Sequence, residues 1–403
     1  MTVIPRTTQP LRICHISTVH PLHDPRIFYL ECWSQVQAGH EVTYLVQSDH
    51  DDYQLNGVRI RSVGKKAAIT AGLRLKQRLS RFVNALKISR SINADVYHIH
   101  DPELIPLAVW LRLRTGAVVI FDAHEDDVAY IRQKTYLHRL LKPILLLAMQ
   151  INVRLAARGL SAIVVCDAGV EALYHRHYGA KHVVIAHNFP RLDVFTLPTN
   201  VPPTDKQYDL VYHGSIPRYH LEIAFNVADI LKQRGVKARW LFFGNCPYLD
   251  WAQREIERRG LKEYVTIDHG WIQYDQVVPR LKTTRIGFIP LPDLPKFQTN
   301  IPSKLFEFMA LEMPTILSDL PPSRPFVGDG TCAIMVKADD YEAYADAITR
   351  LLDDPALCQQ MGAVARARIE RDYHWEKEAV EILKLYERLI EARKRVVDAG
   401  GTA

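Results

Sequence analysis

Residues 11–46 read LRICHISTVHPLHDPRIFYLECWSQVQAGHEVTYLV, and this stretch decides the expected fold. Residues 11–17 form a short run of strand-favouring residues, residues 26–37 have an amphipathic helical pattern, and residues 41–46 form a second strand-like run. Ala38 and Gly39 close the helical pattern. A strand–helix–strand unit of this length predicts a parallel sheet with helices on both faces.

The same alternation continues along the chain and is interrupted once. Further strand-like runs lie at 57–63, 95–99, 117–121, 161–166, 182–185, 209–213, 240–243, 265–267, 285–289, 314–317 and 332–336. Four prolines between residues 190 and 203 interrupt the series. The chain has 403 residues, too many for one ordinary core. We therefore predict an α/β fold of two Rossmann-like, doubly wound parallel-sheet domains with a cleft between them.

The expected domain boundaries follow from the interruption. An N-terminal domain spans 1–190, a linker spans 191–206, and a C-terminal domain spans 207–373. Residues 374–403 carry a long helical pattern rich in Glu, Lys and Leu.

Composition excludes several classes of protein. Hydrophobic residues make up 48% and charged residues 24% of the chain, as in ordinary globular proteins. The six cysteines form no CxxC pair, so a zinc or disulfide framework is not expected. Residues 1–10 lack the apolar region of a signal peptide, and the longest apolar run, residues 144–149, is too short to cross a bilayer. We expect a cytoplasmic protein with no nucleic-acid partner.

Two nucleotide-binding motifs are absent from the sequence. The residues after the first strand lack the GxGxxG glycines of dinucleotide-binding enzymes, and the chain has no GxxxxGK[ST] loop. Hydride transfer and P-loop chemistry are therefore disfavoured.

The net charge of +6 is concentrated in one region. Residues 53–94 contain no acidic residue and ten basic ones: Arg59, Arg61, Lys65, Lys66, Arg74, Lys76, Arg78, Arg81, Lys87 and Arg90. Residues 136–155 also mix leucines and isoleucines with basic residues. The pattern predicts either an anionic membrane surface as a partner, at the inner face of the membrane, or solvated helix faces with basic edges.

Ligands of open α/β sheets bind at the carboxyl ends of strands, so we examined those positions. In the second half, Ser303 is a good N-cap, and the helix start together with Lys304 suits a diphosphate. Glu307 suits the hydroxyl groups of a ribose. The alternative is a capping box between Ser303 and Glu307. Gly214 and Ser215 allow a tight turn with room for phosphate.

Arg218 can reach the same anion as this turn. In the first half, His124 and Glu125 begin a run of four titratable residues at a strand end. This run suits proton transfer or hydrogen bonding to a sugar, and a Mg²⁺ or Mn²⁺ site is the rival interpretation. We favour the metal-free interpretation.

These segments resemble glycosyltransferase family 4, whose members are retaining enzymes of the GT-B fold. The resemblance runs from about residue 11 to 389 and rests on segments in a fixed order, namely HPLHDPRIF at 20–28, HIHDPEL at 98–104, FDAHED at 121–126, HNFP at 187–190, YHGSI at 212–216, HGWI at 269–272, PSKLFEFMALEMPTILSD at 302–319 and MGAVARARIERDYHWEKE at 361–378.

The resemblance implies a role for each matching residue. His124 would contact the donor sugar, Arg218 and Lys304 would hold the diphosphate, and Glu307 would bind the ribose. The terminal helix would cross back to the N-terminal domain. Three departures stand out: Thr299 replaces the first glutamate of the Glu-x7-Glu motif, His220 replaces a second basic residue, and residues 19–21 replace a glycine-rich turn. The implied donor-binding set is Gly214, Ser215, Arg218, Ile272, Ser303, Lys304, Leu305 and Glu307, with His124 and Glu125 as the catalytic pair.

The resulting hypothesis is a retaining, metal-independent hexosyltransferase-like enzyme of polysaccharide or glycoconjugate synthesis. Its donor would be a nucleotide-diphosphate sugar, with no further cofactor, and its acceptor a saccharide or a lipid-linked molecule. Two alternatives remain open: a nucleotide-sugar epimerase of the same fold, and a non-catalytic subunit that resembles a glycosyltransferase.

Overall fold

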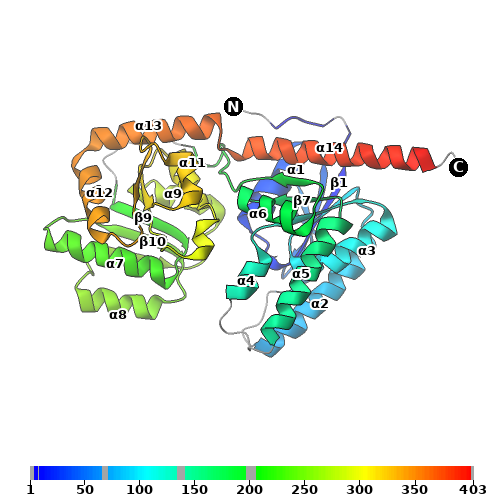
Figure 1. Cartoon of the computed structure of the whole chain (residues 1–403), viewed down its shortest axis with the longest axis horizontal. Helices are drawn as coiled ribbons and strands as arrows, with labels where there is room; N and C mark the ends of the chain where they lie inside the picture. Colours follow the sequence, from blue (N-terminus) through cyan, green and yellow to red (C-terminus); the bar gives the residue numbers. More distant parts are fainter. Residues whose placement is uncertain (1–3, 8, 66–70, 134–140, 197–205, 401–403) are drawn as a thin grey trace. The chain divides into compact units, whose positions relative to one another are not determined.

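The structure is a computed structural model that describes residues 4–7, 9–65, 71–133, 141–196 and 206–400. The chain forms two compact units (Figure 1). Unit 1 contains Met1–Asn188 and Trp375–Ala403, and unit 2 contains Phe189–His374. Much of the predicted linker, residues 197–205, lies outside the described residues, as do Lys66 and residues 134–140 of the two basic segments.

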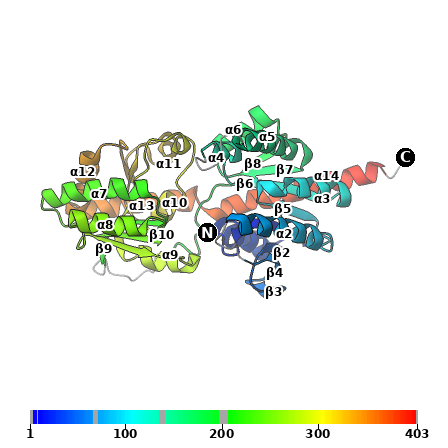
Figure 2. The same cartoon turned by 90° about the horizontal axis from the view of Figure 1, so that it is seen from below.

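Unit 1 is built on an eight-stranded sheet in the order β3-β4-β2-β1-β5-β6-β7-β8. Its strands are β1 (Arg12–Pro21), β2 (Glu41–Gln47), β3 (Tyr53–Leu55), β4 (Val58–Gly64), β5 (Val96–Ile99), β6 (Val118–Ala123), β7 (Ala162–Val165) and β8 (Val183–Ile185). All neighbouring pairs are parallel except β3 and β4, which lie at one edge of the sheet (Figure 2). The predicted doubly wound parallel sheet is therefore confirmed, with one antiparallel hairpin added at its edge. Asn56 and Gly57, both with positive φ, form the two-residue hairpin turn.

The helices of unit 1 cover both faces of its sheet. They are η1 (Pro25–Cys32), α1 (Trp33–Gln37), α2 (Ala71–Ser89), η2 (Pro102–Leu104), α3 (Ile105–Thr115), α4 (Asp127–Gln133), α5 (Leu141–Gly159), α6 (Ala168–Leu173), η3 (Tyr174–Tyr178) and α14 (Trp375–Gly400). One apolar core joins alternate strand residues to α3, α5 and α6. The other joins the opposite face to α14 through Trp375 and Tyr386, so the last helix of the chain completes the core of unit 1.

The expected helix at residues 26–37 is in fact two segments. Residues Pro25–Cys32 form a π-helical segment, and only Trp33–Gln37 is α-helical. A π-helix has more residues per turn than an α-helix, and Arg26 and Glu31, five positions apart, are both buried. Such segments are frequent at functional sites.

Unit 2 contains a six-stranded parallel sheet in the order β11-β10-β9-β12-β13-β14. Its strands are β9 (Tyr208–Ser215), β10 (Trp240–Asn245), β11 (Val265–His269), β12 (Thr284–Ile289), β13 (Thr315–Ser318) and β14 (Ala333–Val336). Its helices are α7 (Arg218–Gln233), α8 (Leu249–Arg259), α9 (Tyr274–Leu281), η5 (Pro295–Gln298), α10 (Ser303–Ala310), η6 (Pro321–Ser323), α11 (Arg324–Val327), α12 (Tyr341–Asp353) and α13 (Pro355–Arg371).

Strand order locates the expected ligand-binding edge of each sheet. In unit 2 the order reverses between β9 and β12, and in unit 1 it reverses between β1 and β5. Ligands of open α/β sheets bind outside the carboxyl ends of the strands at such a switch point. Among the described residues, no helix combines the length and apolar character needed to cross a bilayer.

Candidate functional site

Three glycines line the carboxyl ends of adjacent strands in unit 2. Gly214 lies at the end of β9, Gly244 lies in β10, and Gly270 follows β11. A Cβ atom on Gly244 would lie 2.2 Å from the carbonyl oxygen of Gly214, and the Gly270 N–H donates to the Gly244 carbonyl over 3.0 Å. The strand ends therefore present bare backbone, which lets a ligand approach closely.

Lys304 extends from the first turn of α10 towards this backbone. A Cβ atom on Gly214 would lie 3.3 Å from the Lys304 ammonium, and that ammonium lies 5.3 Å from the ring centroid of Tyr212. Burial lowers the pKa of Lys304, while the nearby carboxylate of Glu307 opposes this shift. The structure thus brings together Gly214 and Lys304, as the sequence predicted.

Glu307 lies one turn further along α10 and contacts His213. Its carboxylate oxygen Oε2 is 2.7 Å from His213 Nε2. Burial raises the pKa of Glu307, but His213 and then Lys304 outweigh this effect and lower it below its ordinary value. The carboxylate is therefore ionised at neutral pH and can accept hydrogen bonds from hydroxyl groups.

The predicted cap of α10 was wrong. Pro302 is the N-cap residue, Ser303 is already the first helical residue, and no side chain caps the helix. The alternative of a capping box is also wrong, because Glu307 contacts His213. The exposed N–H groups that a helix start provides therefore begin at Ser303.

Arg218 and His220 differ from the expected pair of phosphate-binding cations. Arg218 is half-exposed, and its guanidinium donates to Glu222 Oε1 over 2.8 Å and lies 4.5 Å from the ring centroid of Trp251. His220 is buried and both ring nitrogens lack a hydrogen-bond partner. Burial lowers the pKa of His220 well below its ordinary value, and the charges of Lys304 and Lys296 add to this. His220 is therefore a neutral side chain.

The remaining predicted residues of unit 2 take different positions. Ser215 is exposed at the end of β9. Ile272 is partly buried against the same core that fully buries Leu305. Because the side chain of Leu305 is fully buried, it cannot contact a ligand at the strand ends. The Leu305 N–H donates to the Pro302 carbonyl over 3.0 Å. The predicted contact at Leu305 is thus limited to the backbone beside it.

In unit 1, His124 follows β6 and contacts residues from two neighbouring strands. Strand β6 runs to Ala123, two residues further than expected, and Asp122 is buried within it. His124 Nε2 lies 3.2 Å from Asp122 Oδ2 and 3.3 Å from His100 Nδ1. The His124 ring also lies 4.7 Å from the ring of His20. The acidic partner and the two histidines were missed in the sequence.

The rest of the acidic run has other surroundings. Glu125 is half-buried, and the side chain of Asp126 accepts from the N–H groups of Val128 and Ala129 at the start of α4. Burial, together with the charges of Glu125 and Asp126, raises the pKa of Asp127 to about 8. Of the run, only His124 joins a group of metal-ligating side chains, with His100 and Asp122, whose ligand atoms lie within 4.8 Å of one another.

Asp101 organises the end of β1, where residues 19–21 stand in place of the family's glycine-rich turn. Its carboxylate accepts from Ser17 Oγ at 3.0 Å, Val19 N–H at 3.1 Å and the Thr18 N–H. The turn is thus shaped by a buried acceptor rather than by glycines, and it positions His20 beside His124.

His20 is a cation at neutral pH. Burial lowers its pKa, but a 3.1 Å hydrogen bond to Asp24 and the charges of Asp101 and Asp122 outweigh burial and raise the pKa to about 9. An imidazolium at this strand end adds positive charge close to His124.

Asp122 is anchored by Arg26. The Arg26 guanidinium donates to both oxygens of Asp122 over 2.7 and 2.8 Å, and also to the Ala186 carbonyl and to Asn188. Because the pair is bidentate and buried, it fixes the carboxylate that contacts His124. Arg26, from the quoted HPLHDPRIF segment, therefore positions Asp122 and through it His124.

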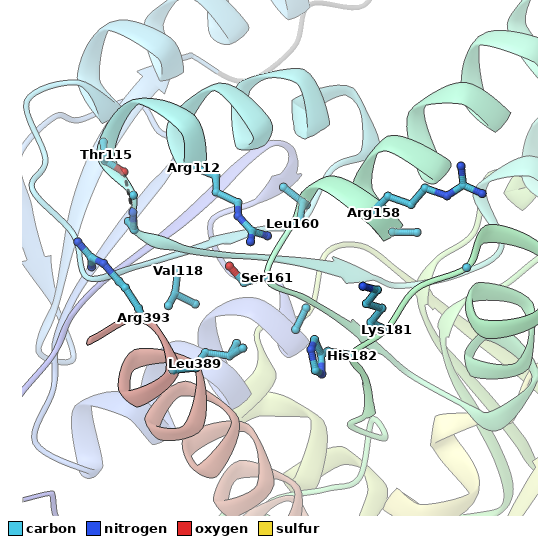
Figure 3. A pocket seen from close by; sticks show the side chains of 16 residues that line it. Arg112, Thr115, Val118, Arg158, Leu160, Ser161, Lys181, His182, Leu389 and Arg393 are labelled. Carbon is cyan, nitrogen blue, oxygen red and sulfur yellow. Dashed lines mark hydrogen bonds between the residues drawn. The ribbon is translucent and has the colours of Figure 1, made fainter. Parts of the chain in front are cut away.

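A cavity of about 950 Å³ lies at the opposite end of the unit 1 sheet (Figure 3). It is lined by Arg112, Arg158, Lys181 and Arg393 among others. It lies where α3 and α5 end and where β6 and β7 begin. Arg112 and Arg158 lie in the last turns of α3 and α5, where a cation balances the helix dipole, so these two residues have a structural explanation there.

Two family models match the chain in sequence. Residues 32–188 match the family described as "Glycosyl transferase 4-like domain", and residues 197–368 match "Glycosyl transferases group 1". Together the two ranges take in most of the chain. The chain belongs to the glycosyltransferases.

Curated relatives match over part of their length. The alpha-D-kanosaminyltransferase of Streptomyces kanamyceticus is 28% identical over 141 residues, 35% of each chain. The phosphatidyl-myo-inositol mannosyltransferase of Mycobacterium leprae is 35% identical over 92 residues, 23% of this chain and 24% of the relative. The matches thus span about a third and a quarter of these relatives.

Solved glycosyltransferase structures share the fold. Sucrose-phosphate synthase from Thermosynechococcus elongatus superposes with a TM-score of 0.73 over 95% of this chain and all of the other, at 17% identity. HepE from Anabaena, solved with UDP and glucose, gives 0.67 over 94% of this chain and all of the other, at 10% identity. This glycosyltransferase therefore has the GT-B fold, with one parallel α/β sheet in each unit.

Proposed function

We propose that this glycosyltransferase moves a sugar from a nucleotide-diphosphate sugar to a saccharide or lipid-linked acceptor, with retention at the anomeric carbon. The observation that carries the proposal is the meeting of Lys304, Gly214 and Glu307 at the switch point of the unit 2 sheet. A cation beside bare backbone suits a diphosphate, and an ionised carboxylate one helical turn away suits ribose hydroxyls. HepE, a structural relative, was solved with UDP bound.

The leaving group would be stabilised by charge already in place. As the bond between the anomeric carbon and the diphosphate oxygen breaks, negative charge grows on that oxygen. Lys304 and the N–H groups at the start of α10 would oppose this charge, without a metal ion at the reacting phosphate. Arg218 could add its charge only by leaving Glu222 and Trp251.

His124 would hydrogen-bond the donor sugar, and Asp122 would orient its ring. The acceptor oxygen would attack the anomeric carbon on the face that the diphosphate leaves. Its proton would pass to the departing phosphate, so no carboxylate nucleophile is required. Glu125 stays a predicted member of the catalytic pair on the grounds of its position beside His124.

Nucleotide binding tests the donor half of the proposal. Thermal unfolding is measured with UDP, GDP, ADP and their sugars, and we expect one nucleoside diphosphate to stabilise the protein in proportion to its affinity. If no nucleotide raises the unfolding temperature at millimolar concentration, the proposed donor site is wrong.

Product analysis by NMR tests the chemistry. We expect donor consumption to require an acceptor and the product to keep the donor's anomeric configuration. Conversion of the donor without acceptor would indicate the epimerase alternative, and binding without turnover would indicate the non-catalytic subunit. We expect His124→Ala to lower kcat by about 10²-fold or more, whereas His177→Gln, an exposed residue, serves as the control.

We further propose that unit 1 contacts an anionic lipid bilayer through α5. This helix exposes the large apolar side chains of Leu141, Ile144, Leu145, Leu147, Ile151 and Leu155. Helix α2 exposes Lys76, Arg78 and Lys87 as well as Leu79 and Val83, and Arg90 is exposed directly after it. An exposed apolar face with basic residues near it is typical of interfacial helices.

Fewer basic residues of the stretch 59–90 can contact a membrane than the sequence suggested. Arg81 is buried and donates to Gln47 Oε1 over 2.8 Å, and Arg59 and Arg61 pair with Asp52 and Asp51. Only part of the basic stretch is therefore available to a membrane. The exposed apolar face of α5 carries the proposal instead.

Vesicle co-sedimentation tests the membrane contact. We expect binding to vesicles with anionic lipid at low salt, and less binding to zwitterionic vesicles. Leu147→Glu should abolish it, whereas Leu113→Glu, on the 82% exposed Leu113 of α3, should not. Equal binding of the two variants, or no binding by the unaltered chain, would refute the lipid contact.

A further inference from the structure

Four metal-ligating side chains meet inside unit 1, away from the surface. The parallel register pairs His15 of β1 with His98 of β5, and His100 lies two residues further along, on the same face. Glu31 reaches the same point from η1. All four are buried, with at most 2% of their surface exposed, and one ligand atom from each lies within 4.8 Å of the others.

The spacing of these atoms suits a tetrahedral ion. Glu31 Oε2 lies 3.7 Å from His15 Nδ1, 3.6 Å from His98 Nδ1 and 3.9 Å from His100 Nε2, while His15 Nδ1 and His100 Nε2 are 2.8 Å apart. Zinc bonds of about 2.0–2.2 Å in a tetrahedron place ligand atoms about 3.3–3.5 Å apart. The observed distances lie on both sides of that value.

The contact between His15 and His100 lacks a proton donor. His15 Nε2 faces Gln35 Oε1 at 2.7 Å, so that nitrogen carries the proton of a neutral ring and Nδ1 has a lone pair. His100 Nδ1 faces the Asp122 carboxylate at 3.3 Å, which leaves the lone pair on Nε2. Two lone pairs thus face each other over 2.8 Å. A cation between them would satisfy both.

Glu31 lacks the hydrogen bonds that a buried carboxylate needs. Neither of its oxygens has a hydrogen-bond partner, although the residue is fully buried. The Arg26 Nε atom lies 3.3 Å from one oxygen, but the guanidinium donates its hydrogen bonds to Asp122 and neighbouring acceptors. An unsatisfied buried carboxylate is costly, so its persistence points to a missing ligand.

We propose that His15, Glu31, His98 and His100 bind a structural Zn²⁺ ion. Three imidazoles and one carboxylate fill a tetrahedral shell and leave no open position, which is typical of a structural rather than a catalytic zinc. The ion would be taken up as the chain folds, because the ligands are fully enclosed. It would stabilise the junction of β1, β5 and η1, and no step of sugar transfer passes through it.

The surrounding residues already hold the ligands in place. Gln35 Oε1 orients His15, and Gln35 Nε2 donates to Tyr386 Oη over 2.9 Å. Tyr386, on α14, lies 2.7 Å from His98 Nδ1. Binding at that nitrogen requires the tyrosine proton to turn away, which a rotating hydroxyl allows. Gln35 contacts the ring nitrogen of His15 that would not bind the ion, so it is an outer partner of the kind that supports the ligands of metal sites, whereas Tyr386 would have to give up its contact with His98 Nδ1.

Metal analysis of the untagged, full-length chain tests the proposal. The chain is expressed with added zinc, purified without chelator, and its metal content is measured by mass spectrometry. We expect about one zinc per chain. Glu31→Gln keeps the side-chain size and removes the charge, and should lower zinc affinity at least about tenfold. His177→Gln is the matched control, since it removes an exposed histidine outside the cluster.

A second measurement needs no variant. After the unaltered chain is unfolded with a strong chelator and refolded without metal, its unfolding temperature should fall, and refolding with Zn²⁺ but not with Mg²⁺ should restore it. Cobalt added in place of zinc should give the visible absorption of a tetrahedral site. Zinc content no higher than background, equal content in Glu31→Gln, or an unfolding temperature indifferent to the chelator would overturn the proposal. If Glu31→Gln does not fold, the chelator experiment decides.

Discussion

The three glycines at the strand ends of unit 2 differ in their tolerance of one methyl group. At Gly244 a Cβ atom would lie 2.2 Å from the Gly214 carbonyl oxygen and 2.9 Å from its carbon and nitrogen, and φ is +130°. The obstacle is the backbone of the neighbouring strand, so no side-chain rotation relieves it. At Gly270 nothing lies within 4 Å and φ is not in the left-handed region.

The cost of Gly244→Ala can be worked from these contacts. The backbone conformation costs about 1–3 kcal/mol and the overpacking about 1–3 kcal/mol, which sum to about 2–6 kcal/mol, and we use roughly 3–4 kcal/mol, near the middle of that range. For a unit of this size each kcal/mol lowers the unfolding temperature by about 2–4 °C. We therefore expect a fall of roughly 6–16 °C, whereas Gly270→Ala should cost about 0.5 kcal/mol or less.

Differential scanning calorimetry measures the effect, with the transition of unit 2 identified by the nucleotide that shifts it. Gly244→Ala should also weaken nucleotide binding, because the strand ends must separate. The fall in unfolding temperature for Gly214→Ala should lie between those for Gly244→Ala and Gly270→Ala, since its methyl group meets the flexible end of Lys304 at 3.2 Å. If Gly244→Ala unfolds within about 2 °C of Gly270→Ala, the backbones of β9 and β10 do not approach each other at Gly214 and Gly244 as closely as described.

Three further predictions concern charged groups of the two units. Lys304→Met should weaken nucleoside-diphosphate binding about 10- to 100-fold in calorimetric titration, whereas Lys262→Met, at an exposed residue before β11, should not; equal affinities would exclude Lys304 from the site. The pKa of His20 is raised to about 9, so the protonated ring adds at most about 3 kcal/mol to the free energy of unfolding. This contribution is complete below pH 6.5 and is lost as the pH rises through 9. The difference in unfolding temperature between the unaltered chain and His20→Asn should therefore shrink from pH 6 to pH 10, and a constant difference would contradict it. Asp122→Asn should destabilise unit 1 by about 3–5 kcal/mol in urea unfolding, because Arg26 loses the carboxylate that accepts two of its hydrogen bonds; a loss below about 1 kcal/mol would show that the guanidinium is held by its other buried acceptors.

The unit 2 site was largely predictable because it depends on local order in the chain. The residues that follow parallel strands meet at one edge of the sheet, so Gly214 and Lys304 could be placed near each other without coordinates. The contact between Glu307 and His213 was not predicted, because residue patterns do not show that the His213 side chain points from β9 towards α10. The cap of α10 was missed by one residue, since Pro302 rather than Ser303 takes the extended conformation before the helix.

The histidine cluster of unit 1 was not predicted, although the spacing of two of its residues indicates that they lie together. His98 and His100 are two residues apart at the end of β5, so both must point to one face of the sheet. The facing residues His15 and Glu31 depend on the register of β1 against β5 and on a π-helical segment. Neither feature is visible in residue patterns. The hairpin of β3 and β4 was signalled by Asn56-Gly57, a pair favoured in two-residue turns.

The return of α14 to unit 1 fixes the order in which the protein can mature on the ribosome. Residues 189–374 are continuous, so unit 2 can complete its core as soon as they emerge. Unit 1 is begun first but must wait for Trp375 and Tyr386, which fill its core and contact Leu30 and His98. Until α14 has been synthesised, one apolar face of the unit 1 sheet is uncovered, and a chaperone would be needed at that face.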